Sequence, residues 1–237
     1  MILEVNNLEG YYGLSQILFG INLEVEKGDS VCLIGRNGVG KTTTLKSIVG
    51  QLNPKVNGKI KGSIKFDGTE LVGMPSYKIA RLGIAYVPQG RHIFPTLTVK
   101  ENLLIAERVG VDGDKTWTLE RIYELFPRLK ERENSKGEKL SGGEQQMLTI
   151  ARGLMQNPKL LIMDEIIEGL APIIVEELVK VVSELRNRGI TILLAEQSLK
   201  FALEVSHKCY IIEKGEVVYK GVSSEIPKEV FVKYLGT

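Results

Sequence analysis

The sequence predicts an α/β protein, with a mixed sheet and a mainly helical subdomain inserted into it. Three observations predict this fold. Short apolar runs alternate with helical patterns at both ends of the chain, and the segment 99–156 is helical in pattern. The runs at 159–164 and 191–195 are almost continuously apolar, which is typical of parallel strands buried on both faces. Strand–helix alternation around such strands indicates helices packed on a sheet.

The elements follow in chain order. In the first part of the chain we expect strands at 2–5, 17–25, 30–34, 60–66 and 83–87, and a helix at 41–49. In the helical segment, Met147, Ile150, Ala151 and Leu154 share one face of a helix that spans 141–156. Beyond it we expect strands at 159–164 and 191–195, helices at 172–188 and 199–205, and a hairpin of 210–213 with 216–219. The prediction is a single domain, 1–237, with a core of about 1–94 and 158–237 and a helical subdomain of about 95–157.

Composition excludes several classes of protein. The 237 residues carry 31 Lys and Arg against 29 Asp and Glu, a net charge of +2, so neither a disordered tail nor a strongly basic nucleic-acid coat is expected. No run approaches the ~18 apolar residues of a membrane span, and the amino terminus does not resemble a signal peptide. Cys32 and Cys209 lie far apart in sequence, which argues against a disulfide framework or a thiolate zinc site and favours a reducing compartment.

A glycine-rich loop joins the strand 30–34 to the helix at 41–49. Residues 35–42, Gly-Arg-Asn-Gly-Val-Gly-Lys-Thr, match G-x-x-x-x-G-K-[ST] at every fixed position. Glycines let the backbone N–H groups wrap a phosphate, and the helix amino terminus adds partial positive charge. Lys41 is expected to reach the β- and γ-phosphates, and the Thr42 hydroxyl to ligate Mg²⁺. A chance glycine turn is the alternative, and the strand–loop–helix order argues against it.

An acidic pair, Asp164 and Glu165, ends the apolar strand 159–164. An Asp at a strand end beside a phosphate loop can hold Mg²⁺. The following Glu165 can orient and deprotonate an attacking water. Solvated acids at a strand exit are the alternative, which the upstream phosphate loop disfavours.

The segment Leu140-Ser141-Gly142-Gly143-Glu144-Gln145 opens the helix 141–156. A serine and two glycines at a helix start present a hydroxyl and bare N–H groups to an anion. In its place between the phosphate loop and the acidic pair, the segment resembles the LSGGQ signature of ABC ATPases, and the resemblance covers the whole chain.

The resemblance implies further site residues and a mechanism. It implies ATP and Mg²⁺ as cofactors, Tyr12 as the residue stacked on adenine (with Tyr11 the weaker candidate), and Gln89 as a glutamine that contacts nucleotide and metal. It implies that two subunits sandwich ATP, so that the signature of one faces the γ-phosphate held by the other. The residues expected to bind nucleotide are then Tyr12, Gly35, Asn37, Gly38, Gly40, Lys41, Thr42, Thr43, Gln89, Ser141, Gly142 and Gly143.

Other segments narrow the resemblance to one branch of the family. Residues 11–13, 90–95, 97–103, 126–129 and 168–172 are similar to ATP-binding subunits of Liv-type importers. This branch serves branched-chain amino acids, with relatives for urea and short amides, and the sequence does not separate the two. It implies transmembrane permease subunits as partners, a second ATPase subunit (the same or related), no nucleic acid, and a peripheral position on the cytoplasmic face of the plasma membrane.

Three positions depart from the general ABC pattern. Ile166 and Ile167 follow Glu165 where Pro and a small hydroxyl residue are usual, which puts the turn geometry in question. Ala171 stands where an Asp is usual. The switch position carries Gln197 in place of His; its amide can donate a hydrogen bond to the γ-phosphate but holds no charge, and it joins Glu165 and Lys41 as the expected catalytic residues.

Two other functional classes were weighed. An ABC ATPase acting on DNA or ribosomes would need a coiled-coil insert or two cassettes in one chain, and the 98 residues between Thr42 and Ser141 leave no room for either. A non-catalytic, nucleotide-gated scaffold remains the alternative, although the presence of Glu165 argues for hydrolysis.

Overall fold

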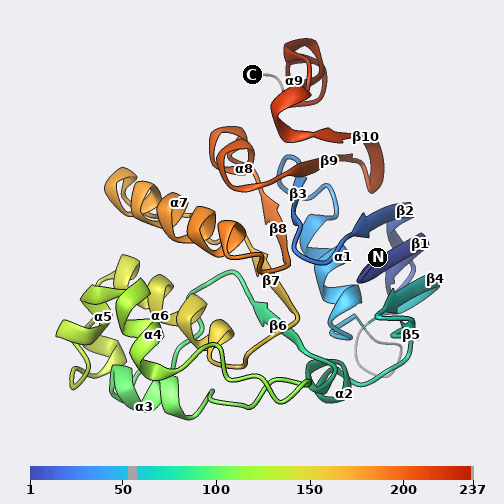
Figure 1. The fold of residues 1–237 in the computed structure, drawn as a ribbon. Helices are drawn as coiled ribbons and strands as arrows, with labels where there is room; N and C mark the ends of the chain where they lie inside the picture. The colour runs from blue at the N-terminus through green and yellow to red at the C-terminus, as the bar shows by residue number, and fades with distance from the viewer. Residues whose placement is uncertain (53–57, 236–237) are drawn as a thin grey trace.

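The strands form two sheets in the computed structural model, which describes residues 1–52 and 58–235 (Figure 1). Residues 53–57 and 236–237 of the predicted domain lie outside this description. The first sheet is antiparallel, in the order β2 (Ser15–Val25), β1 (Leu3–Tyr12), β4 (Lys59–Phe66), β5 (Thr69–Glu70). The second is mixed, in the order β10 (Glu216–Val222), β9 (Lys208–Glu213), β3 (Ser30–Ile34), β8 (Ile192–Glu196), β7 (Leu160–Asp164), β6 (Ile84–Val87). The mixed sheet of the predicted α/β fold is confirmed.

The first strand is longer than predicted. The sequence indicated residues 2–5, whereas β1 continues to Tyr12. Its pairing with β2 shifts register between Val5 and Leu8, and Asn7 has a left-handed φ of 46°. An irregularity of this kind interrupts the two-residue alternation by which a strand is recognised.

The second sheet is buried where its strands are parallel. Every residue of β3, β7 and β8 is buried, as the continuous apolar runs predicted. Helix α1 (Lys41–Ile48) packs between the two sheets, and its Leu45 and Ile48 are fully buried among residues of both. The other face of the second sheet is covered by α6 (Gly142–Leu154), α7 (Pro172–Asn187) and α8 (Leu199–Val205), which share one apolar cluster.

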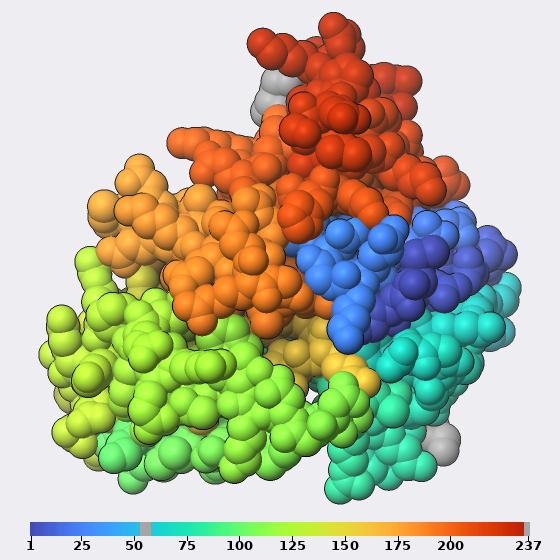
Figure 2. Space-filling model, in the orientation of Figure 1, coloured from blue at the N-terminus to red at the C-terminus, as the bar shows by residue number. Residues whose placement is uncertain are grey.

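The segment 99–156 folds as several separate helices. It contains α3 (Val99–Leu104), α4 (Leu119–Leu125), α5 (Pro127–Glu131), the 3₁₀ turn η1 (Gly137–Lys139) and α6. These helices gather on the side of the molecule away from the antiparallel sheet, and in Figure 2 α3, α4 and α5 form the green lobe beneath α7.

Some elements were not predicted. They are the short helix α2 (Ser76–Arg81), the two-residue strand β5, the turn η2 (Ser223–Glu225) and the last helix α9 (Lys228–Leu235). Cys32 and Cys209, distant in sequence, are register partners on β3 and β9, and both are buried free thiols. Among the described residues no helix is long and apolar enough to cross a membrane.

Candidate functional site

The glycine-rich loop lies between β3 and α1, as its sequence predicted. Gly40, which precedes the first residue of α1, has a φ of 110°, a conformation open to glycine but strained for other residues. It offers no side chain to cap the helix, so the first N–H groups of α1 stay open to an anion. The loop therefore has the geometry of a phosphate cradle.

Lys41 is buried at the base of this loop, with 3% of its surface exposed. Its ammonium donates hydrogen bonds to the carbonyl oxygens of Gly35 at 2.9 Å and Arg36 at 3.1 Å. It also forms an ion pair with the Glu165 carboxylate, at 3.0 Å. The charge of Lys41 is thus held where the loop would hold phosphate.

The strand-end carboxylate of Asp164 faces the loop from β7. One of its oxygens accepts from the Thr42 hydroxyl at 3.0 Å, and the other from the Tyr86 hydroxyl at 3.0 Å. Burial raises the pKa of Asp164, and the bonds from Thr42 and Tyr86 oppose that rise. Burial, with the nearby Asp164 carboxylate, also raises the pKa of Tyr86, so this hydroxyl remains a donor.

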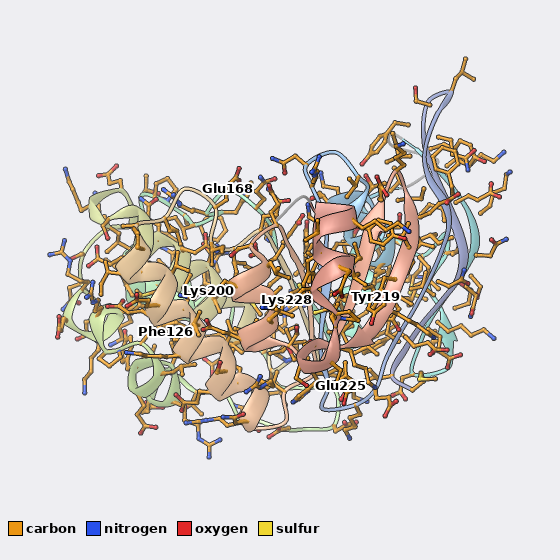
Figure 3. All side chains as sticks on the ribbon, turned by 90° about the horizontal axis from the view of Figure 1, so that it is seen from above. Phe126, Glu168, Lys200, Tyr219, Glu225 and Lys228 are labelled. Carbon is orange, nitrogen blue, oxygen red and sulfur yellow. The ribbon has the colours of Figure 1, made fainter. Side chains whose placement is uncertain are left out.

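Glu165 follows Asp164 and turns out of the strand with a left-handed φ of 46°. Its backbone N–H donates to the Ala195 carbonyl at 2.9 Å, which fixes this turn against β8. Its carboxylate is 8% exposed and accepts from the Gln89 amide at 3.2 Å as well as from Lys41. The Gln89 amide also donates to the carboxylate of Glu168, which follows β7. Figure 3 shows Glu168 at the edge of the molecule opposite to Glu225. A carboxylate so placed can accept a proton from a water above the loop.

A second buried acid lies next to Glu165. Glu196 ends β8 and is 2% exposed, and its Oε1 has no hydrogen-bond partner among the described residues. Burial raises the pKa of Glu196 to about 8, and the Glu165 charge adds to the rise.

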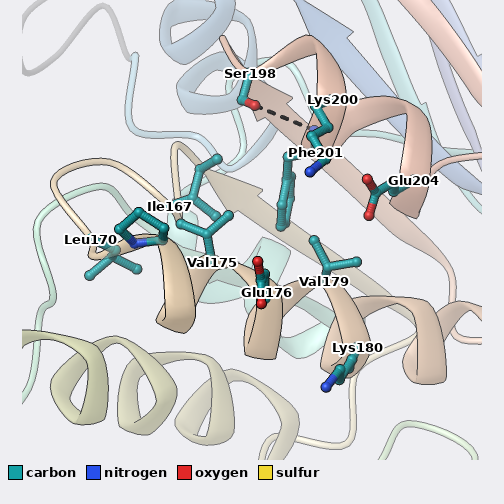
Figure 4. Close-up of a pocket in the computed structure, with 11 residues that line it drawn as sticks. Ile167, Leu170, Val175, Glu176, Val179, Lys180, Ser198, Lys200, Phe201 and Glu204 are labelled. Atoms are coloured by element: carbon teal, nitrogen blue, oxygen red, sulfur yellow. Dashed lines mark hydrogen bonds between the residues drawn. The ribbon is translucent and has the colours of Figure 1, made fainter.

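The Ile166 and Ile167 pair keeps this turn intact. Ile166 is 1% exposed and belongs to the core under α6 and α7. Ile167 lines a largely apolar cavity of about 600 Å³ between α7 and α8, where its side chain and that of Phe201 are drawn in Figure 4. The apolar bulk at these two positions is packing.

A smaller cavity of about 240 Å³ opens over the glycine loop. It gathers most of the nucleotide-binding residues predicted near the loop, namely Asn37, Gly38, Gly40, Lys41, Thr42, Thr43 and Gln89. The expected base Glu165 also lines it, with Ile17 and Glu168. Among the described residues, its lining includes neither Tyr12 nor Gln197 nor the signature. Tyr12 is half-buried at the end of β1, and Gln197 is exposed at the end of β8. Tyr11, the weaker adenine candidate, instead bonds Glu9 and lies under Lys61.

The oxygens around Thr42 suit a magnesium ion bound together with nucleotide. Within the described residues no cluster of three or more acidic, His or Cys side chains could hold a metal by itself. Mg²⁺ is usually held by one or two carboxylates plus phosphate oxygens and waters. Thr42 and Asp164, 3.0 Å apart, fit that role, with Gln89 on the same cavity. Bound there, the ion would neutralise charge on the β- and γ-phosphates.

The signature residues lie at the start of α6. Ser141 caps this helix: its hydroxyl accepts from the Glu144 N–H, and the Glu144 carboxylate accepts from the Ser141 N–H at 2.7 Å. Ser141 is exposed, and Gly142 is half-buried beneath the guanidinium of Arg91. None of the described residues at this helix start lines the nucleotide cavity of its own chain.

A phosphate-binding glycine loop with a lysine, a threonine and a strand-end Asp–Glu pair defines a P-loop nucleotide hydrolase. The chain belongs to the ABC transporter family, whose model matches residues 18–168, and it is an ATP-binding, ATP-hydrolysing domain of that family. It resembles the Liv-type importer ATPases, as the sequence predicted.

The relatives include ATP-binding proteins of branched-chain amino acid transport and of lipopolysaccharide export. The chain is 43% identical to the high-affinity branched-chain amino acid transport ATP-binding protein BraG of Pseudomonas aeruginosa, covering 92% of this chain and 91% of that one. It is 33% identical to the lipopolysaccharide export system ATP-binding protein LptB of Haemophilus influenzae, covering 99% and 97%. A solved ATP-binding cassette of an ABC transporter in its ADP conformation is 30% identical, with a TM-score of 0.78 and 98% of each chain covered.

Three residues of the site were missed by sequence reasoning. Tyr86 reaches Asp164 from β6, Glu168 reaches Gln89, and Glu196 underlies Glu165. The signal for Tyr86 lies in strand pairing, because it is the register partner of Ile162, two residues before Asp164. A charged residue at the end of a fully apolar strand, as Glu196 is, was the other available signal.

Proposed function

We propose that the chain is the ATP-hydrolysing subunit of an importer for branched-chain amino acids, bound through permease subunits to the cytoplasmic face of the plasma membrane. One observation carries the proposal: the likeness to BraG, at 43% identity over nearly the whole length of both chains, exceeds that to LptB at 33%. A urea or short-amide importer is the alternative within the same branch.

Hydrolysis in this proposal uses residues from two subunits. Lys41 leaves Glu165 and turns to the β- and γ-phosphates, while Thr42, Asp164 and Gln89 hold Mg²⁺. Glu165, freed from the lysine, takes a proton from the attacking water, and Gln197 donates to the γ-phosphate. Tyr12 stacks on adenine, and Ser141, Gly142 and Gly143 come from the opposing subunit. Loss of the γ-phosphate removes the charge that bridges the subunits, and the dimer reopens.

The solute is tested in the assembled transporter. The chain, its permeases and its solute-binding protein are placed in liposomes, and ATP hydrolysis is measured with leucine, isoleucine, urea or acetamide outside. Stimulation by leucine and isoleucine is expected; stimulation by urea or acetamide alone would move the chain to the alternative. ATPase stimulated by lipopolysaccharide and by none of these solutes would overturn an import role.

The surface beside Gln89 supports a permease contact. Phe94 is 43% exposed, and the Cζ atom of Arg152 lies over its ring, 4.5 Å from the ring centroid. Next to this loop, a cavity of about 250 Å³ separates α2 from the end of α6 and includes Ile79, Tyr86 and Gln156. We propose that a short permease helix docks along this surface, because the exposed ring and the adjoining cavity offer apolar area to it.

Phe94→Asp tests that contact. The variant is expected to bind and hydrolyse ATP in isolation but to lose solute-stimulated hydrolysis in the liposomes. Val232→Asp is the control, because it places the same charge at another exposed apolar residue, on α9. This variant is expected to keep solute-stimulated hydrolysis. Normal stimulation of the Phe94 variant would exclude this surface, and loss of folding, read from its thermal transition, would assign Phe94 to the subdomain core.

The sharing of the site between chains is tested by mixing two inactive variants. Ser141→Arg blocks the signature, and Glu165→Gln removes the base. In a mixed dimer one site carries both defects, while the other joins an intact loop to an intact signature. Recovery of up to one site per mixed dimer is expected; no recovery in purified, doubly tagged dimers would show that each site is built within one chain.

A further inference from the structure

Arg91 joins three functional segments that are distant in sequence. It comes two residues after Gln89, and both Gly90 (φ 100°) and Arg91 (φ 56°) are left-handed. Two successive residues of this kind turn the chain sharply, at a cost that a non-glycine residue bears only where the surroundings hold it. The turn directs the Arg91 side chain to the loop after β7, where its guanidinium donates to the Gly169 carbonyl at 3.1 Å.

The same guanidinium covers the start of α6. A β-carbon placed on Gly142 would lie 2.4 Å from Nη1 and 3.0 Å from Cζ of Arg91. Glycine is therefore required at this signature position for the arginine to approach so closely. Arg91 is in contact with the signature of its own chain, and it is not among the residues that line its own nucleotide cavity.

The charge of Arg91 has no acidic partner among the described residues. The Gly169 carbonyl is the one hydrogen-bond acceptor found for it there, although a guanidinium carries five N–H donors. The side chain is half-exposed, and it lies at a helix amino terminus that itself carries partial positive charge. Two positive groups side by side favour an anion, and a guanidinium matches the geometry of phosphate oxygens.

We propose that Arg91 contacts the γ-phosphate of the ATP held by the opposing subunit, together with Ser141, Gly142 and Gly143. The proposal rests on the shared site described under Proposed function. Arg91 moves with the signature against which it packs, so dimer closure brings its free donors to the partner's nucleotide. It then stabilises charge on the transferred phosphoryl group, as an arginine supplied by a second chain does in other nucleotide hydrolases.

Three substitutions separate charge from structure. Arg91→Ala is expected to lower the turnover of ATP by about 10²-fold or more, the cost of removing one strong donor from a transition state. Nucleotide affinity of the monomer should be unchanged, because its own loop is intact. Arg91→Gln keeps a donor for the Gly169 carbonyl but removes the charge, and it is expected to be as impaired as the alanine variant; Arg91→Lys is expected to recover part of the activity. Arg188→Ala, which removes an arginine paired with Glu184 at the far end of α7, is the control and should keep full activity.

Mixed dimers identify the chain on which Arg91 acts. If it acts on the partner's nucleotide, Arg91→Ala mixed with Glu165→Gln recovers activity, and Arg91→Ala mixed with Ser141→Arg does not. An arginine that serves its own nucleotide gives the reverse pattern. All mixtures are measured on dimers purified through two different tags.

The outcomes distinguish the role of Arg91 from the shared nucleotide site on which it depends. Failure of the Ser141→Arg with Glu165→Gln pair overturns the shared site, and the role of Arg91 with it. Success of that pair together with the reverse Arg91 pattern overturns only the role of Arg91. Near-normal turnover of Arg91→Gln would show that the arginine merely ties the signature to the loop at Gly169.

Discussion

Lys41 and Glu165 bind each other at 3.0 Å in a site that ATP must enter. In the proposed mechanism nucleotide therefore competes with the Glu165 carboxylate for Lys41, and the expected base is held in place by the group expected to bind the phosphates. A charge-assisted bond between buried groups is strong, so breaking it is part of the cost of binding ATP. Substitution of either residue changes binding and chemistry in different ways.

We expect Glu165→Gln to bind ATP at least as tightly as the unaltered protein, because it releases Lys41, while turnover falls by roughly 10²–10⁴. Lys41→Ala should weaken ATP binding, because it removes a cation from the phosphates. Titration with a fluorescent ATP analogue and an assay of phosphate release measure the two effects. A Glu165→Gln protein with near-normal turnover would contradict the assignment of the base.

Glu196 predicts a pH dependence of stability. Burial raises its pKa to about 8 in the folded chain, from the ordinary glutamate value of 4.5. Between these values the folded state keeps a proton that the unfolded state has lost, so stability falls as pH rises from 4.5 to 8, by about 1.4 kcal/mol per unit at most from this group. Below 4.5 and above 8 its contribution is constant.

Glu196→Gln should remove that slope. Chemical unfolding at several pH values gives the free energy of unfolding of both proteins. Between pH 5 and 8, the value for Glu196→Gln is expected to rise steadily relative to that of the unaltered protein. Glu216→Gln, at an exposed position on β10, should follow the unaltered protein throughout. Parallel curves for Glu196→Gln and the unaltered protein would show that this carboxyl is ionised over the whole range.

At the scale of elements, two helices begin with the same device. Thr98 and Glu101 cap α3, and Ser141 and Glu144 cap α6, each pair bonding reciprocally. Such a box satisfies N–H groups that a helix start otherwise leaves open. In α6 the capping serine is also the signature serine, so the box sets the position of its hydroxyl.

Glu144→Ala and Glu101→Ala remove the equivalent half of each box. Each should lower the free energy of unfolding by about 1 kcal/mol. ATP hydrolysis should fall for Glu144→Ala but not for Glu101→Ala. Of the two capping residues that lose a partner, Ser141 belongs to the proposed site and Thr98 does not. Denaturant unfolding and steady-state hydrolysis check the pair, and equal losses of hydrolysis in both variants would separate the α6 cap from catalysis.

At the scale of the whole molecule, the nucleotide cavity and the signature belong to different lobes. The cavity is lined by the glycine loop, the start of α1 and Glu165 after β7. The signature instead begins α6, one of the helices on the side of the molecule away from the antiparallel sheet (Figure 1). In the proposed shared site, the signature facing each cavity comes from a second chain. ATP would then act as the bridging charge between two subunits, so that binding and assembly become one equilibrium.

Glu165→Gln should therefore elute as a dimer in ATP and as a monomer in ADP, because it binds ATP without hydrolysing it. Size-exclusion chromatography with light scattering measures the mass. Lys41→Ala should stay monomeric in both nucleotides. If Glu165→Gln also stays monomeric in ATP at concentrations well above its nucleotide affinity, the isolated chain does not close on ATP.

Local sequence determined the phosphate loop, the acidic strand end and the buried strands. These depend on residues within a few positions of each other: Gly40 permits a φ of 110°, and β7 needs apolar side chains on both faces. The full length of β1 was hidden by an irregularity at Asn7, and α2 by its length of six residues, which is too short for a helical period. Tertiary structure alone decided which groups meet across the sheet and between the lobes: Tyr86 on Asp164, Glu196 under the turn of Glu165, and Arg91 over Gly142. Such contacts join residues tens of positions apart, and they arise from strand order and helix packing, which no local pattern encodes.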